Sequence, residues 1–324
     1  MTILLCGGAG YIGSHMLQRL LRDGHGVVVL DNLSTGHRAA VQGCELVIGN
    51  LLDTPLLEQV FEQHRFDVVM HFCAKSLVAE SMLEPYAYYR NNVAGTLNLL
   101  AAMRAHDVQR LIFSSTAAVY GTPLTDSIGE DHPRKPINPY GRSKLMVEEI
   151  LCDAARAHGL RSVSLRYFNA AGASDDASIG EAHDPETHLI PNVLRAAEPG
   201  ALPLSVYGTD YPTRDGTCVR DYVHVDDLAQ AHLAALAYLD AHDGAHAFNL
   251  GNGAGFSVLE ILRAAGNVTG REIPWNAAAR RDGDPATLVA NSAYAREQLG
   301  WQPRHTQIES IIASAWRWHC ARRY

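Results

Sequence analysis

The sequence predicts an α/β fold with a doubly wound parallel sheet, followed by a smaller mixed α/β C-terminal lobe. In the first half of the chain, short apolar runs rich in β-branched residues alternate with amphipathic stretches, a pattern typical of parallel strands joined by crossover helices. After Gly172 this alternation gives way to polar segments that contain proline and glycine. The 324 residues are also many for one compact unit. We therefore expect two domains, residues 1–174 and 175–324.

Each expected element corresponds to one such run or stretch. The apolar runs predict strands at residues 2–6, 27–30, 45–48, 68–72, 110–114 and 162–167. The amphipathic stretches predict helices at 13–22, 55–63, 86–106 and 140–158, and in the second domain at 188–197, 225–239, 257–269 and 306–322. A further strand at 246–250 is expected to return to the first domain. Because ligands in such sheets bind beyond the carboxyl ends of the strands, the residues that follow each strand are the candidate site residues.

Composition excludes several classes of function. Hydrophobic residues make up 47% and charged residues 19% of the chain, as in ordinary globular proteins. The formal net charge of -8 disfavours nucleic acid and anionic membrane surfaces as partners. The 16 histidines form no H-E-x-x-H motif and no His/Cys cluster, so we expect no metal site.

Cysteine usage and the N-terminus point to the cytoplasm. The six cysteines show no C-x-x-C spacing, and several lie in apolar runs, which favours buried free thiols in a reducing compartment. The chain starts without a basic and apolar leader, and no apolar run reaches about 18 residues. We therefore expect a cytoplasmic protein with no membrane partner.

A glycine loop follows the first expected strand. In GGAGYIGS, Gly7, Gly10 and Gly13 are spaced G-x-x-G-x-x-G at the start of a helical stretch. Glycine lets backbone N–H groups approach a pyrophosphate at a helix N-terminus. The second strand ends at Asp31, whose carboxylate can accept from adenosine ribose hydroxyls and repels a 2′-phosphate. The loop therefore predicts a Rossmann-type site for NAD in preference to NADP, against the alternative of a glycine turn without a ligand.

A tyrosine and a lysine lie four residues apart in NPYGRSKLMVEE. Tyr140 and Lys144 begin an expected helix and share one of its faces. A phenol with a pKa of about 10 is a poor base at neutral pH, but a nearby ammonium and a positively charged nicotinamide both favour phenolate. Lowering this pKa to about 7 requires about 4 kcal/mol, within the reach of a shielded site with two cations. Tyr140 is therefore a candidate general base, although the spacing alone also fits an exposed helical pair.

A hydroxyl completes the candidate catalytic set. Thr116, in SSTAAVYG, lies just past the expected strand 110–114, where it can bridge a substrate alcohol and the Tyr140 phenolate. The alternative is a serine/threonine turn that closes the strand.

Six strings in order, GGAGYIGSH, DNLSTGH, SSTAAVYG, YGRSK, RYFNAAGA and VRDYVHVDDLA, make the chain resemble the UDP-glucose (UDP-galactose) 4-epimerase family of extended short-chain dehydrogenases/reductases. The resemblance runs nearly end to end. It implies NAD held in the N-terminal domain and a UDP-hexose bound by the C-terminal domain. It also implies Tyr140 as base and acid, Thr116 as the sugar-hydroxyl contact and Lys144 as the ribose anchor.

The family's binding residues carry over by position. The cofactor contacts that the resemblance implies are Gly7, Gly10, Tyr11, Ile12, Gly13, Asp31, Asn32, Asn50, Leu51, Phe72, Cys73, Ala74, Asn92, Ser114, Tyr140, Lys144 and Tyr167. The substrate contacts are Thr116, Tyr140, Asn169, His188, Leu189, Tyr207, Arg220, Arg281, Asp284 and Leu288. Two arginines can neutralise a diphosphate and a carboxylate can accept from ribose hydroxyls. As isolated residues, Arg220 and Arg281 would more often be solvated or paired with neighbours such as Asp221 and Asp282.

Three positions depart from the family pattern. Asn50 stands where aspartate usually meets the adenine amino group, although its amide oxygen can still accept that hydrogen bond. Thr116 replaces the more usual serine and keeps the hydroxyl. Cys73 stands where a small apolar residue is common.

Other functions within the resemblance stay open. Sugar-nucleotide 4,6-dehydratases share the cofactor and the Tyr/Lys pair, but they need an acid where this chain has Ala117 and Ala118. A 4-epimerase of UDP-GlcNAc/UDP-GalNAc or of a UDP-pentose is a nearer alternative, since Leu288, at the position that gates space beside the sugar, is of intermediate size. A non-catalytic NAD-binding regulator is less consistent with the retained catalytic set. The family also suggests a homodimer through the helices at 86–106 and 140–158.

Overall fold

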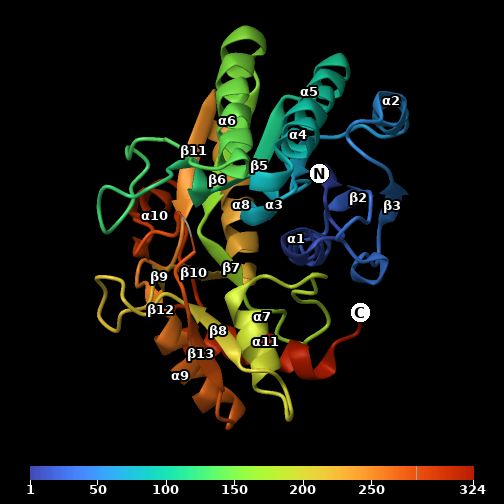
Figure 1. Ribbon diagram of the computed structural model, residues 1–324. Helices are drawn as coiled ribbons and strands as arrows, with labels where there is room; N and C mark the ends of the chain where they lie inside the picture. The colour runs from blue at the N-terminus through green and yellow to red at the C-terminus, as the bar shows by residue number, and fades with distance from the viewer. Residues whose placement is uncertain (282) are drawn as a thin grey trace. The chain divides into compact units, whose positions relative to one another are not determined.

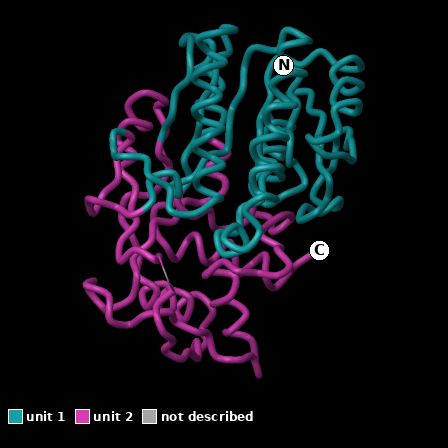
Figure 2. The backbone as a smooth tube through the Cα atoms, turned by 45° about the horizontal axis from the view of Figure 1, so that its top comes forward, with its two compact units in different colours: residues 1–121, 131–167, 231–248 teal, residues 122–130, 168–230, 249–324 magenta. Residues whose placement is uncertain are grey.

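The chain forms two compact units in a computed structural model that describes residues 1–281 and 283–324. Unit 1 comprises residues 1–121, 131–167 and 231–248, and unit 2 comprises residues 122–130, 168–230 and 249–324 (teal and magenta in Figure 2). The expected boundary at residues 174/175 thus lies inside unit 2. The return to the first unit, expected around 246–250, spans 231–248.

The main sheet has seven strands in the order β11-β6-β5-β4-β1-β2-β3 (Figure 1). The pairings from β3 to β6 are all parallel, and the chain reverses its direction of travel across the sheet between β1 and β4. This is the doubly wound arrangement that the sequence predicts, and the expected fold class is confirmed. The strands are β1 (Thr2–Cys6), β2 (Gly26–Asp31), β3 (Glu45–Ile48), β4 (Val68–His71), β5 (Arg110–Thr116), β6 (Arg161–Tyr167) and β11 (Ala245–Leu250).

Alternation along the central strands divides the core of unit 1 into two layers. Leu4, Cys6, Val28 and Leu30 pack in one cluster with apolar side chains of three helices, α2 (Thr54–Gln63), α5 (Gly95–Ala105) and α6 (Pro139–His158). The intervening residues of the same strands are also fully or nearly fully buried, as are apolar residues of α1 (Tyr11–Arg22). Parallel sheets bury both faces in this way, so polar side chains gather at the strand ends.

The expected helix at 86–106 is divided in the structure. It consists of α4 (Pro85–Tyr88), a π-helical segment η2 (Tyr89–Ala94) and α5, and it is preceded by α3 (Val78–Leu83), which the sequence analysis did not predict. The π segment carries Asn92, whose buried amide bonds to two other elements. Single π turns of this kind occur mostly at functional sites.

Unit 2 is built from small sheets around a helical core. The apolar faces of α7 (Leu189–Ala196), α9 (Val258–Thr269) and α11 (Ile308–Ala321) pack together in one cluster. A further helix is α10 (Ala293–Leu299), while α8 (Val225–Ala241) runs from unit 2 into unit 1. The strands are β7 (Asn169–Ala171) with β10 (Tyr222–His224), β8 (Leu204–Tyr207) with β13 (Trp275–Ala278), and β9 (Val219–Arg220) between β12 (Phe256–Ser257) and β14 (Thr287–Leu288).

The short strands of unit 2 were not anticipated because two to four residues carry no readable alternation. Within the described residues, no helix combines the length and the apolar character needed to cross a bilayer. All six cysteines are free thiols, but only Cys6 and Cys218 are buried, so the expectation of buried thiols holds for two of them.

Candidate active site

The glycine loop connects the carboxyl end of β1 to the N-terminus of α1. A side chain at Gly13 would place its Cβ 2.1 Å from the Gly7 carbonyl oxygen, and a Cβ at Gly7 would lie 2.8 Å from the backbone of Cys73. Gly7 also has a φ of +84°. These two glycines are therefore required by the fold of the protein itself.

Gly10 is different because the protein leaves room for a side chain there. A Cβ at Gly10 would meet only the Gly7 carbonyl oxygen, at an ordinary 3.5 Å, among the described residues. Gly10 is the N-cap of α1, and no side chain of the described chain caps this helix end. An open cradle at an uncapped helix N-terminus suits a pyrophosphate, which accepts from backbone N–H groups. The residues present thus fit a dinucleotide.

Asp31 supports this loop from the end of β2. Its buried carboxylate accepts hydrogen bonds from the backbone N–H groups of Ala9 (2.9 Å) and Leu33 (2.8 Å). Burial raises the pKa of Asp31, and the two backbone hydrogen bonds oppose this increase. Carboxylate oxygens retain further acceptor capacity for ribose hydroxyls, so one residue both orders the glycine loop and presents a negative charge beside it.

The other expected cofactor residues of unit 1 also lie after strands. Asn32 and Asn50 follow β2 and β3, and their side-chain oxygens accept from the N–H groups of Ser34 and Leu52. In the segment after β4, the ring of Phe72 packs against His232 at a centroid distance of 4.8 Å. The hydroxyl of Tyr167, at the end of β6, contacts Nε2 of His232 at 2.5 Å. Tyr11 and Ile12 begin α1, Leu51 is buried after β3, and Cys73 and Ala74 follow Phe72.

Tyr140 lies in the first turn of α6. Asn138 caps this helix by accepting from the N–H of Gly141 (2.8 Å), and Pro139 supplies its first residue. A Cβ at Gly141 would lie 2.4 Å from the carbonyl oxygen of Ala118, so glycine lets this helix end approach the segment after β5. The approach brings Tyr140 within hydrogen-bonding reach of Thr116.

The environment of Tyr140 favours the neutral phenol. Burial raises its pKa above 10.0, and a hydrogen bond from the Thr116 hydroxyl opposes this increase. The sequence predicts a lowered pKa, caused by Lys144 and a charged nicotinamide. In the protein alone the pKa is raised instead, because burial outweighs the hydrogen bond from Thr116.

Lys144 lies one turn beyond Tyr140 and is only 2% exposed. Its Nζ donates to the backbone carbonyl of Ser114 at 2.6 Å and lies 4.7 Å from the centre of the Phe113 ring. Burial lowers the pKa of Lys144 from 10.5 to about 7, although Cys73 and Glu148 oppose this decrease. The lysine thus lies at the carboxyl end of β5, the strand that ends at Thr116.

Glu148 is a buried residue of this site that the sequence analysis missed. Its carboxylate accepts from the Ser115 hydroxyl (2.5 Å) and from two nitrogens of Arg166 (2.9 and 2.7 Å). Arg166 in turn donates to the hydroxyl of Tyr120 (2.7 Å). These bonds fix α6 to β5 and β6, so the network positions the helix that carries Tyr140 and Lys144. The i, i+4, i+8 spacing of Tyr140, Lys144 and Glu148 was the available signal.

Asn92 makes a second buried connection. Its Nδ2 donates to Ser143 Oγ and to the carbonyl of Lys75, both at 3.0 Å, and its Oδ1 accepts from the N–H of Lys75 at 2.9 Å. Asn92 therefore joins the π-helical segment, the loop after β4 and α6.

Unit 2 gathers most of the expected nucleotide contacts. Arg220 Nη2 donates to Asp284 Oδ1 at 2.7 Å, and Leu288 is the register partner of Arg220 across β14 and β9. The guanidinium of Arg281 lies 4.0 Å from the centre of the Tyr207 ring. Two guanidinium groups, a carboxylate and an aromatic ring thus come from three separate parts of the sequence.

The alternative partners of these arginines have different roles. Asp221 is fully buried and accepts from the backbone N–H groups of Asn252, Gly253 and Ala290, so Arg220 pairs with Asp284 instead. Asp282 lies outside the described residues.

The remaining expected substrate residues are Asn169, His188 and Leu189. Asn169 lies in β7 and donates to the carbonyl of Asp221 at 2.7 Å. Leu189 begins α7 and His188 is its N-cap. The His188 ring contacts the carboxylates of Glu181 and Glu186, an interaction that the sequence analysis did not anticipate.

Comparison with known proteins agrees with this geometry. The model of the NAD dependent epimerase/dehydratase family matches residues 3–251. The chain is 53% identical over 320 residues to the UDP-glucose 4-epimerase of Lacticaseibacillus casei, with 98% of this chain and 97% of the relative covered.

Two solved structures extend the likeness to the fold. The Brucella ovis UDP-glucose 4-epimerase in complex with NAD has a TM-score of 0.94 and 49% identity, covering 98% of this chain and 97% of that chain. The Bifidobacterium longum UDP-glucose 4-epimerase in complex with NAD+ and UDP has a TM-score of 0.95 and 38% identity, covering 99% of each chain. The chain belongs to the NAD-dependent epimerase/dehydratase family, whose members are enzymes that use NAD.

Proposed function

We propose that the protein interconverts UDP-glucose and UDP-galactose by inverting C4 of the hexose through a transient 4-keto sugar. The observation that carries the proposal is the half-buried Tyr140, whose phenol is hydrogen-bonded by the Thr116 hydroxyl and which is followed one turn later by the buried Lys144. The relatives named above as UDP-glucose 4-epimerases support the same substrate pair.

In this mechanism Tyr140 moves one proton in each direction. As phenolate it takes the proton of the sugar 4-OH, with the Thr116 hydroxyl bridging the two oxygens, and later returns it. Bound NAD would supply the hydride acceptor at C4 and a positive charge that favours the phenolate. Because the sugar would be oxidised and then reduced at the same carbon, the overall reaction would be an isomerisation that consumes no second substrate.

Lys144 and Glu148 keep the catalytic tyrosine in place. Lys144 joins α6 to the Ser114 carbonyl, and Glu148 joins the same helix to Ser115 and Arg166. Held at both points, the start of α6 has little freedom to move relative to β5. Positioning of this kind is a large part of general acid–base catalysis.

Unit 2 carries the groups proposed to hold UDP. Arg220 and Arg281 would neutralise the diphosphate, and Asp284 would accept from the ribose hydroxyls. Arg281 and Tyr207, which is 39% exposed, form a cation–π pair. The uracil ring could stack on the Tyr207 ring, and the phosphates could pair with the Arg281 guanidinium. Leu288 would set the space beside the sugar, which is the position that decides between plain and N-acetylated hexoses.

The closest alternative is a 4-epimerase acting on UDP-GlcNAc/UDP-GalNAc or on a UDP-pentose, since the intermediate size of Leu288 excludes neither. The dehydratase alternative lacks its acid. Residues Ala117 and Ala118 occupy the 3-10 turn η3 (Ala117–Val119) directly after Thr116, and alanine cannot protonate a leaving hydroxyl.

The decisive test is incubation of purified protein with UDP-glucose, UDP-GlcNAc and UDP-xylose separately, without added reductant, followed by chromatographic resolution of the products. We expect UDP-galactose from the first. Tyr140→Phe should retain NAD and lose at least about 1,000-fold in kcat, whereas Tyr238→Phe, a buried tyrosine of α8, should not. Failure of NAD-loaded wild type to convert UDP-glucose would reject this substrate pair, and normal turnover of Tyr140→Phe would reject the base.

The assembly and location of the enzyme belong to the same proposal. We propose a homodimer through α3, α4, α5 and α6, since Met82, Leu83 and Tyr86 expose 60%, 81% and 86% of their surface and such patches mark interfaces. Static light scattering should give twice the chain mass, and Leu83→Glu should reduce it. Free thiols and NAD use also support a cytoplasmic enzyme.

A further inference from the structure

Four possible metal ligands lie together in unit 2, apart from every residue assigned above except His188. Glu181, His183, Glu186 and His188 follow the spacing E-x-H-x-x-E-x-H, and one ligand atom of each lies within 4.8 Å of the others. We propose that these four side chains form a structural site for a divalent first-row transition metal, with Zn²⁺ as its occupant.

The distances within the cluster are close to those of a metal centre. His188 Nδ1 lies 2.7 Å from Glu181 Oε1 and 3.1 Å from Glu186 Oε1, and His183 Nδ1 lies 3.2 Å from Glu181 Oε1. Ligand atoms of a tetrahedral zinc, each about 2.1 Å from the ion, are about 3.4 Å apart. For coordination the shortest contacts must lengthen slightly, and the widest separation, up to 4.8 Å, must shorten by about 1.4 Å.

Burial makes the two carboxylates costly unless they are neutralised. The side chains of Glu181 and Glu186 are 7% and 1% exposed, and the ion pairs described for them go to the two histidines. A divalent cation bound by both carboxylates would compensate their buried charge.

The ligand set selects the class of ion. Two imidazoles and two carboxylates suit Zn²⁺ and related first-row ions, whereas Ca²⁺ and Mg²⁺ prefer all-oxygen sites. Four protein ligands complete a tetrahedral shell and leave no open position, which is typical of structural zinc. The site is therefore proposed to stabilise the segment that leads into α7.

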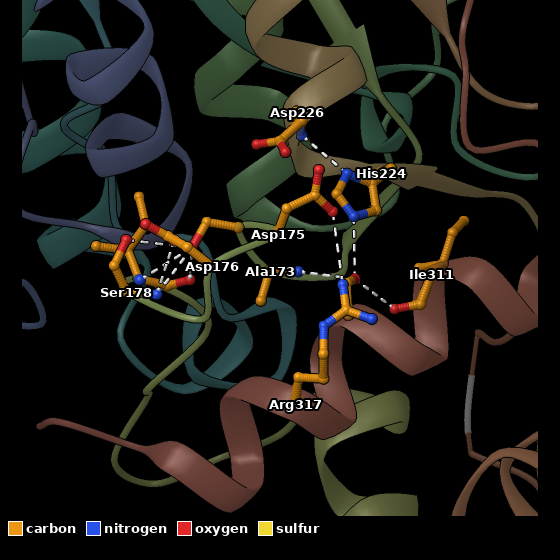
Figure 3. Close-up of polar contacts among 11 residues, drawn as sticks. Ala173, Asp175, Asp176, Ser178, His224, Asp226, Ile311 and Arg317 are labelled. Carbon is orange, nitrogen blue, oxygen red and sulfur yellow. Dashed lines mark hydrogen bonds and ion pairs between the residues drawn. The ribbon is translucent and has the colours of Figure 1, made fainter.

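Contacts with α11 order the segment that carries the four side chains without any metal. Trp318 Nε1 in α11 donates to the carbonyl of Glu181 at 2.8 Å, and its ring packs on Ala173 and Ala182. The preceding loop is fixed to the same helix, because the N–H of Ala173 donates to Ser314 Oγ (3.1 Å) and Asp175 pairs with Arg317 (Figure 3).

The same view shows how the loop is closed on itself. Asp176 Oδ1 accepts from the N–H of Ser178 (Figure 3). His224 Nε2 contacts Ser314 Oγ, the same hydroxyl that accepts from Ala173. Ligands carried on an already ordered backbone need little reorganisation to bind an ion.

A small cavity adjoins the carboxylates. It measures about 20 Å³, and its walls include Glu181, Glu186, Arg195 and Arg322. This volume accommodates one water molecule, which can hydrogen-bond to the carboxylate oxygens that do not bind the metal. Hydrogen bonds of this kind, to ligand atoms that do not touch the metal, orient carboxylate ligands.

Occupation of the site has a local consequence. His188 is the N-cap of α7, and Leu189 is the first residue of that helix. A metal bound by His188 would fix the start of α7, where the family resemblance implies Leu189 as a substrate contact.

The test is metal analysis of tag-free protein. Wild type is stripped with a chelator, incubated with excess ZnCl₂, gel-filtered and analysed by mass spectrometry for zinc per chain. We expect about one zinc, held against a weak chromophoric chelator, and a rise in the unfolding temperature on loading. The double variant His183→Ala/His188→Ala should lose both effects. The control His242→Ala/His246→Ala removes a histidine pair of unit 1 and should keep them.

The design separates this site from other sources of zinc. All six thiols remain in both double variants, so zinc bound by cysteine would persist when His183 and His188 are absent. If that variant does not fold, X-ray absorption of loaded wild type should show nitrogen and oxygen neighbours at about 2.0–2.1 Å and no sulfur at about 2.3 Å. Less than a tenth of an equivalent of zinc in wild type, or a sulfur shell, would refute the proposal and leave a cluster of histidine–carboxylate ion pairs.

Discussion

Alanine at Gly10 should separate cofactor binding from folding. Gly10 has φ -78° and ψ 174°, which alanine adopts without strain, and its Cβ would lie 3.5 Å from the Gly7 carbonyl oxygen. The stability of cofactor-free protein should therefore change by no more than about 1 kcal/mol. The new methyl group would occupy the space in which a pyrophosphate approaches the helix N-terminus.

The expected loss of affinity follows from the hydrogen bonds displaced. A bond from a backbone N–H to a charged oxygen contributes about 1.5–3 kcal/mol, so losing one of them weakens NAD binding about 10- to 100-fold. The matched variant Gly13→Ala should behave in the opposite way. Its Cβ would lie 2.1 Å from the Gly7 carbonyl oxygen, and relieving that overlap should cost about 3 kcal/mol of stability.

The assay combines two measurements on charcoal-treated protein. Urea unfolding gives the stability of each variant without cofactor, and calorimetric titration with NAD gives the affinity. Unchanged NAD affinity in Gly10→Ala would show that the pyrophosphate does not approach this glycine. A loss of stability as large as that of Gly13→Ala would show that the space beside Gly10 is not open.

Three further predictions concern buried charge and substrate binding. Because the pKa of Lys144 falls from 10.5 to about 7 on folding, the unfolded chain holds more protons between these values, and wild-type stability should rise with pH across that window. Cofactor-free Lys144→Met should lack this part of the rise when unfolding by urea is measured at several pH values. Equal slopes of stability against pH in the two proteins would contradict the burial argument. Glu148→Ala should lower the free energy of unfolding in urea by about 3–5 kcal/mol, because it leaves the buried Arg166 charge without its partner. Glu148→Met/Arg166→Met should recover most of this stability. A double variant as unstable as the single one would argue against an unpaired charge as the cause. Arg220→Gln should raise KM for the UDP-sugar about tenfold at similar kcat, and an unchanged KM in steady-state assays would remove Arg220 from the diphosphate site.

The strand–loop–helix part of the fold was predictable because each element satisfies its own local requirement. β1 and β3 begin and end where the apolar runs do, and α6 begins one residue before the expected position because Pro139 provides its first residue. The glycine loop was readable for a similar reason, since Gly13 is required by its close contact with the backbone of Gly7, six residues earlier.

The features that the sequence did not reveal depend on contacts between distant segments. The π turn carries Asn92, whose side-chain amide bonds to Lys75 and Ser143. Neither partner is near Asn92 in the sequence. The pairing of Arg220 with Asp284 spans 64 residues. The cluster of Glu181 and His188 is local, but its spacing matches no familiar metal motif and was therefore passed over.

The protonation states of the catalytic pair show why the cofactor belongs to the catalyst. Burial acts on both residues in the direction of neutrality, because it raises the pKa of Tyr140 and lowers that of Lys144 to about 7. A positively charged nicotinamide beside Tyr140 would favour the phenolate and oppose the effect of burial. In the proposed mechanism the general base therefore forms only once the dinucleotide is bound, so a chain without NAD would hold the proposed catalytic residues but lack the phenolate.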